Sequence, residues 1–208
     1  MTKAIIFDLD GVLVDSKETH FNALNLALSD YDPKYVISKT EQEHVYEGMT
    51  TKSKLDVLTM KKGLPSSAYH DIWESKQRYT AKLFKGVGLD QELIVLLNII
   101  KSQGIKIGVA SNSIRETLDT CLSNLGILKL IDVSLSNEDV TKPKPDPEIY
   151  VSCMEALGAK ADATVIYEDS EIGQEAARSS GGHLIPVYNR SSINLITIHE
   201  GIDYLAKH

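Results

Sequence analysis

The stretch Lys3-Ala4-Ile5-Ile6-Phe7-Asp8-Leu9-Asp10-Gly11 decides the fold. It is a short apolar run that ends in two acids and a glycine, which is typical of a buried parallel strand. Similar runs follow at residues 106–110, 131–135, 163–167 and 183–187. Apolar residues recur at helical spacing between these runs, at residues 91–102, 114–125, 148–157 and 172–179. This alternation predicts an α/β fold, a Rossmann-like doubly wound parallel sheet.

Residues 16–84 interrupt the alternation, because they contain no strand-like run. Apolar positions at helical spacing, such as Phe21, Leu24 and Leu28, predict a series of helices there. The segment follows the first strand directly, so we expect it above the carboxyl end of that strand. Ligands of open α/β sheets bind at this end. The predicted domains are therefore a core of residues 1–15 and 85–208 and an inserted small α-helical cap of residues 16–84.

Composition excludes several classes of partner. The 208 residues include 22 basic and 29 acidic side chains, and the net charge of −7 argues against general binding to nucleic acid or to an anionic membrane. The apolar stretch Leu93–Ile100 is far shorter than the roughly 20 residues that span a bilayer. The sequence start carries no signal-like apolar segment, and Cys121 and Cys153 fit two reduced thiols, so we expect a cytoplasmic protein.

Two pairs of acidic residues follow predicted strands. Asp8 and Asp10 end the first strand, and Glu168 and Asp169 end another. Each pair has a simpler interpretation, a solvated turn for the first and capping of the next helix for the second. Because parallel strands end at one edge of a sheet, the four carboxylates are expected to meet, and such an oxygen cluster suits Mg²⁺.

Two further segments could bind an anion. Ser111-Asn112-Ser113 links a predicted strand to a helix and offers hydroxyl, amide and backbone donors, although either serine could simply cap that helix. The second segment is the proline-rich loop Lys142–Pro147, which could hold a lysine toward an anionic centre. It could equally be a solvated charge run or an extended docking segment for a partner.

These four segments, in this order, resemble the motifs of the haloacid dehalogenase superfamily over essentially the whole chain. Residues 8–16 resemble the first motif, Ser111 the second, Lys144 within Lys-Pro-Asp-Pro the third, and Glu168-Asp169-Ser170 the fourth. The insertion resembles the small α-helical cap of the β-phosphoglucomutase-like and phosphoglycolate-phosphatase-like branch. Aspartate-nucleophile phosphate transfer is what this resemblance implies.

The resemblance also implies roles for the acids. Asp8 would attack phosphorus to form an aspartyl phosphate, and Asp10 would protonate the leaving oxygen and later activate water. Mg²⁺ would be held by Asp8, the backbone carbonyl of Asp10 and Asp169, with Glu168 as a direct or water-mediated ligand.

Further residues would serve the phosphoryl group. Ser111 and Asn112 would hold its oxygens, and Lys144 would neutralise charge around it. Lys144 is favoured over Lys142 by its Lys-Pro-x-Pro context. Gly11 would let the backbone approach closely.

The cap bears on the choice between phosphatase and mutase. Residues 48–55 resemble its specificity loop, where β-phosphoglucomutases place an Arg, but this chain has Thr51 and Lys52. Lys52 lacks the bidentate fork of Arg and weakens the mutase interpretation. His20 lies where mutases also have His, although a structural role is an alternative, and Lys76 is a further candidate for substrate contact.

The leading hypothesis is a Mg²⁺-dependent phosphatase that hydrolyses a small phosphorylated metabolite, such as a sugar phosphate. A phosphosugar mutase of the β-phosphoglucomutase type is the alternative. A non-catalytic binding protein that docks through residues 142–147 is a third. We expect a monomer or weak homodimer.

Overall fold

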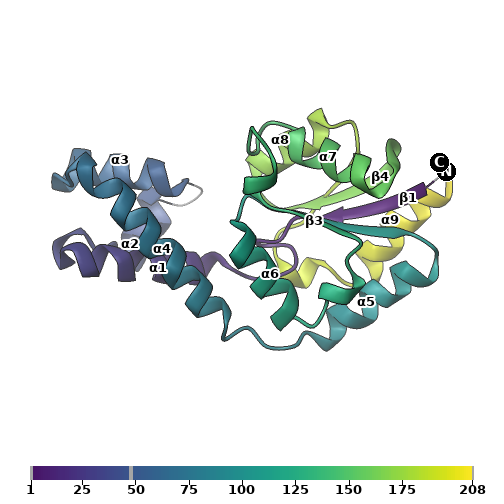
Figure 1. Cartoon of the computed structure of the whole chain (residues 1–208), viewed down its shortest axis with the longest axis horizontal. Coiled ribbons are helices and arrows are strands. Elements are labelled where there is room, and N and C mark those ends of the chain that lie inside the picture. The colour runs from purple at the N-terminus through teal and green to yellow at the C-terminus, as the bar shows by residue number, and fades with distance from the viewer. Residues whose placement is uncertain (1, 47–48, 208) are drawn as a thin grey trace. The chain divides into compact units, whose positions relative to one another are not determined.

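The computed structural model describes residues 2–46 and 49–207. It divides the chain into two compact units (Figure 1). The first joins Met1–Asp15 to Val87–His208, and the second is Ser16–Gly86. Each unit is described separately below.

The first unit is built on a five-stranded parallel sheet with the order β3-β2-β1-β4-β5. Its strands are β1 (Thr2–Phe7), β2 (Lys106–Ala110), β3 (Val133–Leu135), β4 (Ala159–Glu168) and β5 (His183–Pro186). The chain runs from β1 outward to β2 and β3, then returns to the other side of β1 with β4. The predicted doubly wound α/β sheet is thus confirmed, with its topological switch point between β1 and β4.

Helices cover both faces of this sheet (Figure 1). On one face lie α5 (Gln91–Ser102) and α9 (Leu195–Lys207), and on the other lie α7 (Glu148–Leu157) and α8 (Glu171–Ser179). The unit also contains α6 (Arg115–Asn124) and the short helices η4 (Leu128–Leu130), η5 (Asn137–Asp139) and η6 (Arg190–Ser192). The apolar faces of α7 and α8 bury the sheet residues Ile6 and Ile166, which fixes the carboxyl ends of the central strands in a rigid core.

The second unit is helical, as its periodicity predicted. Its elements are α1 (Lys17–Tyr31), η1 (Pro33–Tyr35), α2 (Lys39–Glu41), the π-helical η2 (Gln42–Tyr46), α3 (Thr51–Lys62), η3 (Ser66–Ala68) and α4 (Tyr69–Phe84). Helices α1 and α4 pack against each other, and Leu28, Leu58 and Ile72 are buried in a separate core. Gly48, the first residue of the expected specificity loop, lies outside the described residues.

Two strands differ in length from their apolar runs. β3 begins at Val133 and not at residue 131, because Asp132 exchanges hydrogen bonds with Ile107 through both its backbone and its carboxylate before the ladder starts. β4 begins at Ala159 and not at residue 163, since its first four residues alternate between half-buried and exposed positions. Side chains of a strand alternate between its two faces, so this half-exposed part of β4 contains polar residues and no continuous apolar run.

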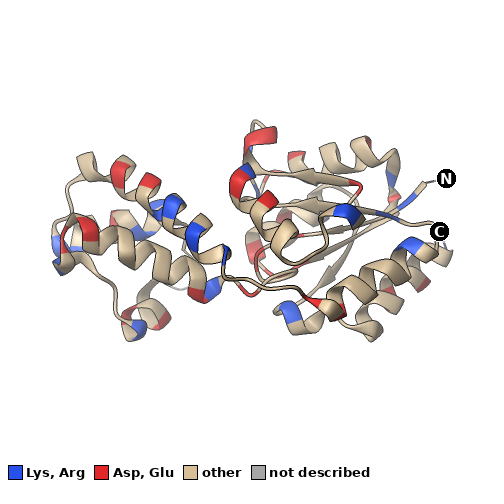
Figure 2. Ribbon diagram, turned by 60° about the horizontal axis from the view of Figure 1, so that its bottom comes forward, with Lys and Arg blue, Asp and Glu red and all other residues tan. Residues whose placement is uncertain are grey.

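Charged residues of both signs are interspersed along the helices of each unit (Figure 2). Among the described residues, no helix is long and apolar enough to cross a membrane.

Candidate active site

The strand register brings the first acidic motif beside the fourth. Phe7 pairs with both Val109 of β2 and Tyr167 of β4. The next residue, Asp8, therefore stands level with Ala110 and Glu168 at the carboxyl edge of the sheet. Its backbone N–H continues the ladder by donating to the Tyr167 carbonyl at 3.0 Å. This edge is the switch point at which open α/β sheets bind ligands.

Lys144 lies at the centre of this edge and is buried with Asp8 and Glu168. Its Nζ donates to Asp8 Oδ1 at 2.6 Å and to Glu168 Oε2 at 2.7 Å. The Ala110 carbonyl and the Tyr150 hydroxyl accept from the same nitrogen, each at 2.9 Å. The loop therefore directs one lysine inward, whereas Lys142 remains exposed, so only Lys142 fits the interpretation of a solvated charge run.

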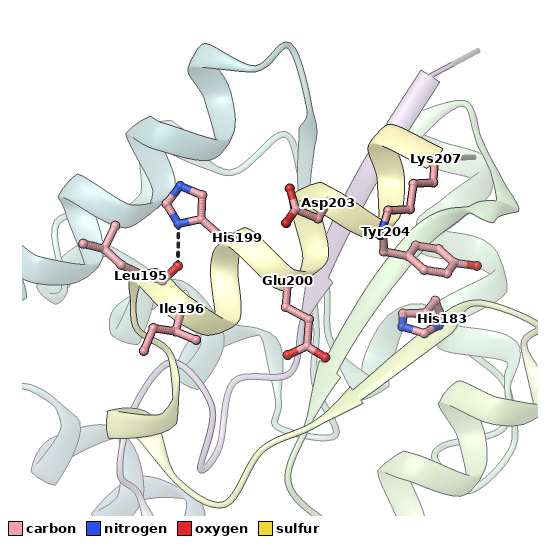
Figure 3. Close-up of a pocket in the computed structure, with 8 residues that line it drawn as sticks. All are labelled: His183, Leu195, Ile196, His199, Glu200, Asp203, Tyr204 and Lys207. Atoms are coloured by element: carbon pink, nitrogen blue, oxygen red, sulfur yellow. Dashed lines mark hydrogen bonds between the residues drawn. The ribbon is translucent and has the colours of Figure 1, made fainter.

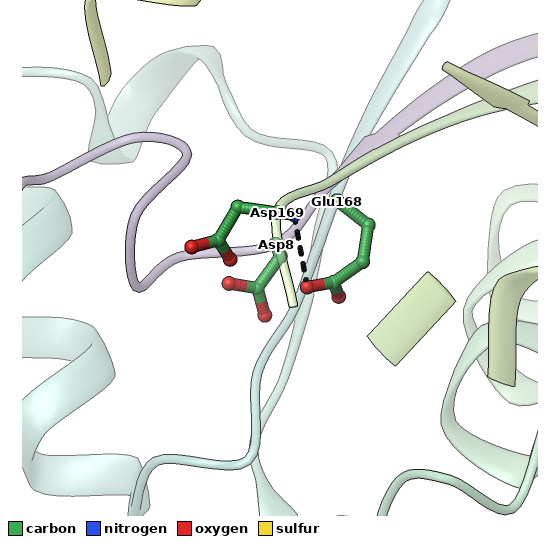
Figure 4. Close-up of side chains that lie close together, drawn as sticks. All are labelled: Asp8, Glu168 and Asp169. Carbon is green, nitrogen blue, oxygen red and sulfur yellow. Dashed lines mark hydrogen bonds between the residues drawn. The ribbon is translucent and has the colours of Figure 1, made fainter. Parts of the chain in front are cut away.

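Three carboxylates form a cluster (Figure 4), and Lys144 donates to two of them. Asp8, Glu168 and Asp169 each present an oxygen, and these oxygens all lie within 4.8 Å of one another. Hard cations such as Mg²⁺ prefer carboxylate oxygens, so this donor set fits the expected metal. The Asp10 side chain is not part of the group, so the structure brings together three of the four carboxylates that were expected to meet. The ligand that the resemblance implied for Asp10 was its backbone carbonyl.

Burial and the neighbouring charges shift the pKa values of this cluster. Burial, and next the charge of Glu168, raise the pKa of Asp8 well above 3.8, while Lys144 acts in the opposite direction. Burial would also raise the pKa of Glu168, but the charge and hydrogen bonds of Lys144 and the Tyr150 hydroxyl lower it overall. Lys144 itself would lose its proton more easily through burial, but Asp8, Tyr150 and Glu168 hold its pKa well above 10.5. Because Lys144 contributes one positive charge beside the three carboxylates of the cluster, a bound cation would relieve their repulsion.

Glu168 and Asp169 do not cap the helix that follows them. The cap of α8 is Ser170, whose side chain accepts from the Gly173 backbone N–H at 3.2 Å. Glu168 Oε1 instead accepts from the backbone N–H groups of Asp169 and Ser170, both at 3.1 Å. The capping interpretation of this acidic pair is therefore wrong.

Two glycines make room for these acids. A Cβ on Gly11 would lie 2.2 Å from Asp169 Oδ2, and a Cβ on Gly173 would lie 2.1 Å from the Glu168 carboxyl carbon. Gly11 also has a φ of +87°, which disfavours other residues. At each of these positions, glycine leaves the space that the neighbouring carboxylate occupies, and any larger residue would displace that carboxylate.

The second motif lies against the same edge. Ser111 is buried, and its Oγ accepts from the Ser113 backbone N–H at 3.0 Å. Asn112 contacts the lysine loop, because its Oδ1 accepts from the Lys144 backbone N–H at 3.1 Å. Neither serine caps α6, whose N-cap residue is Ile114 and whose first N–H, on Arg115, donates to Glu138. The helix-capping interpretation of Ser111 and Ser113 is therefore wrong.

The remaining candidates belong to the helical unit. His20 on α1 and Lys76 on α4 lie side by side, with 3.4 Å between Nδ1 and Nζ. The His20 ring also meets Phe84 edge-on. Lys52 lies in the first turn of α3, which Thr50 caps. The structure thus groups His20 with Lys76 and leaves Lys52 on another element of the same unit.

Sequence reasoning missed two side-chain contacts of the site. The Tyr150 hydroxyl donates to Glu168 Oε2 at 2.5 Å, and the Ser113 hydroxyl donates to Asp10 Oδ2 at 2.7 Å. Tyr150 lies within the apolar face of α7, where a buried hydroxyl needs a polar partner, and that requirement was the available signal. Ser113 belonged to the segment expected to bind an anion or to cap a helix, and nothing in the sequence indicated its contact with Asp10.

A separate pocket of about 700 Å³ lies along α9 and next to His183 of β5 (Figure 3). His183 stacks on Tyr204 there, with 3.7 Å between ring centroids. Every lining residue except His183 comes from α9, and none of the predicted site residues lines this pocket. The chemistry predicted from the sequence therefore belongs to the carboxylate cluster and not to this pocket.

Residues 5–187 match the family model described as haloacid dehalogenase-like hydrolase. A phosphorylated carbohydrates phosphatase of Thermotoga maritima is 32% identical over 86% of this chain and 82% of that protein. A phosphoglycolate phosphatase of Rhodospirillum rubrum is 25% identical over 87% of this chain and 77% of that protein. Among solved structures, a β-phosphoglucomutase from Clostridium difficile covers all of both chains with a TM-score of 0.77 at 22% identity. The last similarity concerns the fold alone.

Proposed function

The chain belongs to the haloacid dehalogenase-like hydrolase family, and we propose that it is a Mg²⁺-dependent phosphatase acting on a small phosphorylated metabolite through an aspartyl phosphate. The observation that carries this proposal is the buried contact of Lys144 with both Asp8 and Glu168 at the switch point of the sheet. A nucleophilic carboxylate beside a cation-binding cluster suits the transfer of an anionic group.

In this proposal two carboxylates share the chemistry. Asp8 attacks phosphorus, the bond from phosphorus to the ester oxygen breaks, and Asp10 gives that oxygen its proton. Water then attacks the aspartyl phosphate, Asp10 takes the proton from the water, and inorganic phosphate leaves while Asp8 is regenerated. The Ser113 hydroxyl orients the Asp10 carboxylate through its 2.7 Å hydrogen bond.

Other groups bind the phosphoryl oxygens and balance their charge. Lys144 supplies a buried positive charge beside Asp8, and Ser111 and Asn112 lie on the adjacent strand end. When bound by Asp8, Asp169, the Asp10 carbonyl and Glu168, Mg²⁺ would supply positive charge that screens the nucleophile from the phosphate. Gly11 and Gly173 hold open the space that two of these carboxylates occupy.

We propose that the helical unit Ser16–Gly86 is the cap that selects the substrate, with His20 and Lys52 as its contact residues. The name of the Thermotoga maritima relative supports a phosphorylated carbohydrate as the substrate class. The mutase alternative is weaker, because Thr51 and Lys52 stand where a mutase Arg would grip a second phosphate. We also propose a cytoplasmic monomer or weak homodimer, and the net charge of −7 disfavours nucleic-acid and anionic membrane partners.

Phosphate release tests the proposal. The full-length protein is assayed with and without Mg²⁺ on a panel of phosphosugars, phosphoglycolate, nucleotides and an aryl phosphate. Asp8→Asn should abolish release, whereas the control Asp162→Asn, at an exposed position of β4, should retain it. Phosphate release that survives in Asp8→Asn would exclude the proposed nucleophile. Isomerised sugar phosphate with little release would favour the mutase.

A further inference from the structure

We infer that Tyr150 is a positioning residue, whose hydroxyl holds the Lys144 ammonium and the Glu168 carboxylate in one fixed arrangement. This inference rests on the proposed phosphatase function and extends it to a residue outside the four motifs. Tyr150 lies on α7 and is completely buried. Its hydroxyl lies 2.9 Å from Lys144 Nζ and 2.5 Å from Glu168 Oε2.

The direction of these two hydrogen bonds is fixed by chemistry. An ammonium only donates and a carboxylate only accepts, whereas a hydroxyl does both. The single proton of the Tyr150 hydroxyl therefore points to Glu168, and its oxygen accepts from Lys144. The hydroxyl dipole is aligned between an anion and a cation, an arrangement that a phenyl ring cannot reproduce.

Lys144 depends on this hydroxyl for its placement. Its ammonium has three N–H donors but lies within hydrogen-bond distance of four oxygens. Two of the acceptors are uncharged, the Ala110 carbonyl fixed by β2 and the Tyr150 hydroxyl fixed by the packing of α7. These uncharged acceptors hold Nζ in place without neutralising it, so its charge remains available to Asp8 and an incoming phosphate.

Glu168 is oriented by donors on both of its oxygens. Oε1 accepts from the backbone of Asp169 and from both the backbone and the hydroxyl of Ser170. Oε2 accepts from Lys144 and Tyr150. Loss of the Tyr150 hydroxyl would leave Oε2 with Lys144 as its one donor among the described residues, which allows the carboxylate to rotate in the cluster.

The test compares Tyr150→Phe with Tyr167→Phe. Phe retains the buried ring, whose centroid lies 4.6 Å from Lys144 Nζ, and removes only the hydroxyl. Tyr167 is the matched control, because it is also fully buried and its hydroxyl donates at 2.6 Å to the Thr197 carbonyl, away from the cluster. Both variants lose a buried hydrogen bond, so both should have a lower thermal midpoint.

Only Tyr150→Phe should change the site. Groups that orient catalytic and metal-binding side chains are typically worth about 10- to 100-fold in activity or metal affinity. We expect kcat to fall at least about 10-fold with KM within about 3-fold, and the Mg²⁺ Kd from calorimetry without substrate to rise about 10-fold. Equal kcat and Mg²⁺ Kd in the two variants would overturn the inference. A wild-type protein that neither binds Mg²⁺ nor releases phosphate would instead overturn the proposed function.

A double-mutant cycle with Lys144→Met shows whether Tyr150 acts through the lysine. In that background the shift that Tyr150→Phe causes in kcat should be less than about 2-fold, because the hydroxyl has no ammonium to place. The Mg²⁺ Kd should still rise, because the hydroxyl also donates to Glu168 Oε2. An undiminished shift in kcat would refute the coupling. If Tyr150→Phe unfolds the wild-type chain but not the Lys144→Met chain, the coupling is also supported, whereas unfolding in both backgrounds assigns Tyr150 a purely structural role.

Discussion

Replacing Gly11 by Ala should weaken Mg²⁺ binding far more than it weakens the fold. Gly11 has a φ of +87°, and an added Cβ would lie 2.2 Å from Asp169 Oδ2. Gly158 provides the control, because its φ of +68° is similar and an added Cβ there meets nothing within 4 Å. Both substitutions place a side chain in the left-handed region, which costs about 1–2 kcal/mol.

The difference between the two variants is the displacement of Asp169. Ordinary contact begins at 3.4 Å, so the carboxylate must move by about 1.2 Å (3.4 − 2.2). Asp169 is only half-buried and its side chain can rotate, so the additional loss of stability should stay below about 1 kcal/mol. Mg²⁺, however, needs oxygen ligands at about 2.0–2.1 Å in nearly ideal octahedral geometry. A carboxylate displaced by that amount no longer serves as a ligand.

Urea unfolding and Mg²⁺ titration of phosphate release separate the two effects. Gly11→Ala and Gly158→Ala should lose similar unfolding free energy. The Mg²⁺ concentration for half-maximal activity should rise at least about 10-fold in Gly11→Ala only, which corresponds to about 1.4 kcal/mol. The same Mg²⁺ dependence in both variants and the wild type would refute the assignment of Asp169 to the metal.

Three other perturbations have defined outcomes. Lys144→Met should lower the unfolding free energy in urea by about 3–5 kcal/mol at neutral pH, because Asp8 and Glu168 lose their buried partner, and added Mg²⁺ should restore part of it. Asp132→Asn should lower the unfolding free energy by about 1–2 kcal/mol, because the Asp132 carboxylate accepts hydrogen bonds from Lys101 and the Ile107 N–H. Burial would raise the pKa of Asp132, but these hydrogen bonds lower it below 3.8 overall. The difference in unfolding free energy between the wild type and the variant should therefore persist at neutral pH, and it should vanish as the pH falls through the pKa of Asp132 in the folded state. Chelation by EDTA should abolish phosphate release without changing the helical circular-dichroism signal, and Mg²⁺ should restore it.

The sequence predicts most of the core because the physical signals there are local. Buried parallel strands are apolar runs, and polar residues directly after them must share one edge of the sheet, as Asp8 and Glu168 do. Strand ends are harder to predict, because they depend on partners. β3 is shortened by a carboxylate of Asp132 that takes a ladder hydrogen bond, and β4 is extended through Lys160 and Asp162, whose polarity hides the strand.

The site residues that were missed depend on tertiary contacts. Tyr150 shares its helix face with Ile149 and Cys153, so its periodicity indicates a core residue. Only the folded chain places its hydroxyl between Lys144 and Glu168. Ser113 resembles a helix cap in sequence, but the helix begins beyond it and its hydroxyl is free to reach Asp10, 103 positions away.

Charge balance explains why the proposed phosphatase site would need both a divalent cation and the lysine. Asp8, Glu168 and Asp169 carry −3 when ionised, and Lys144 contributes +1, so the cluster carries −2 (−3 + 1). A phosphate monoester is itself an anion and would be repelled from Asp8 by that charge. A monovalent ion would leave −1, whereas a divalent cation brings the sum to zero. This excess charge is therefore the reason that the proposed site should bind Mg²⁺ before it accepts a substrate. The pKa of Asp8 is raised first by burial and then by the charge of Glu168, and a cation beside Asp8 would favour its ionised form.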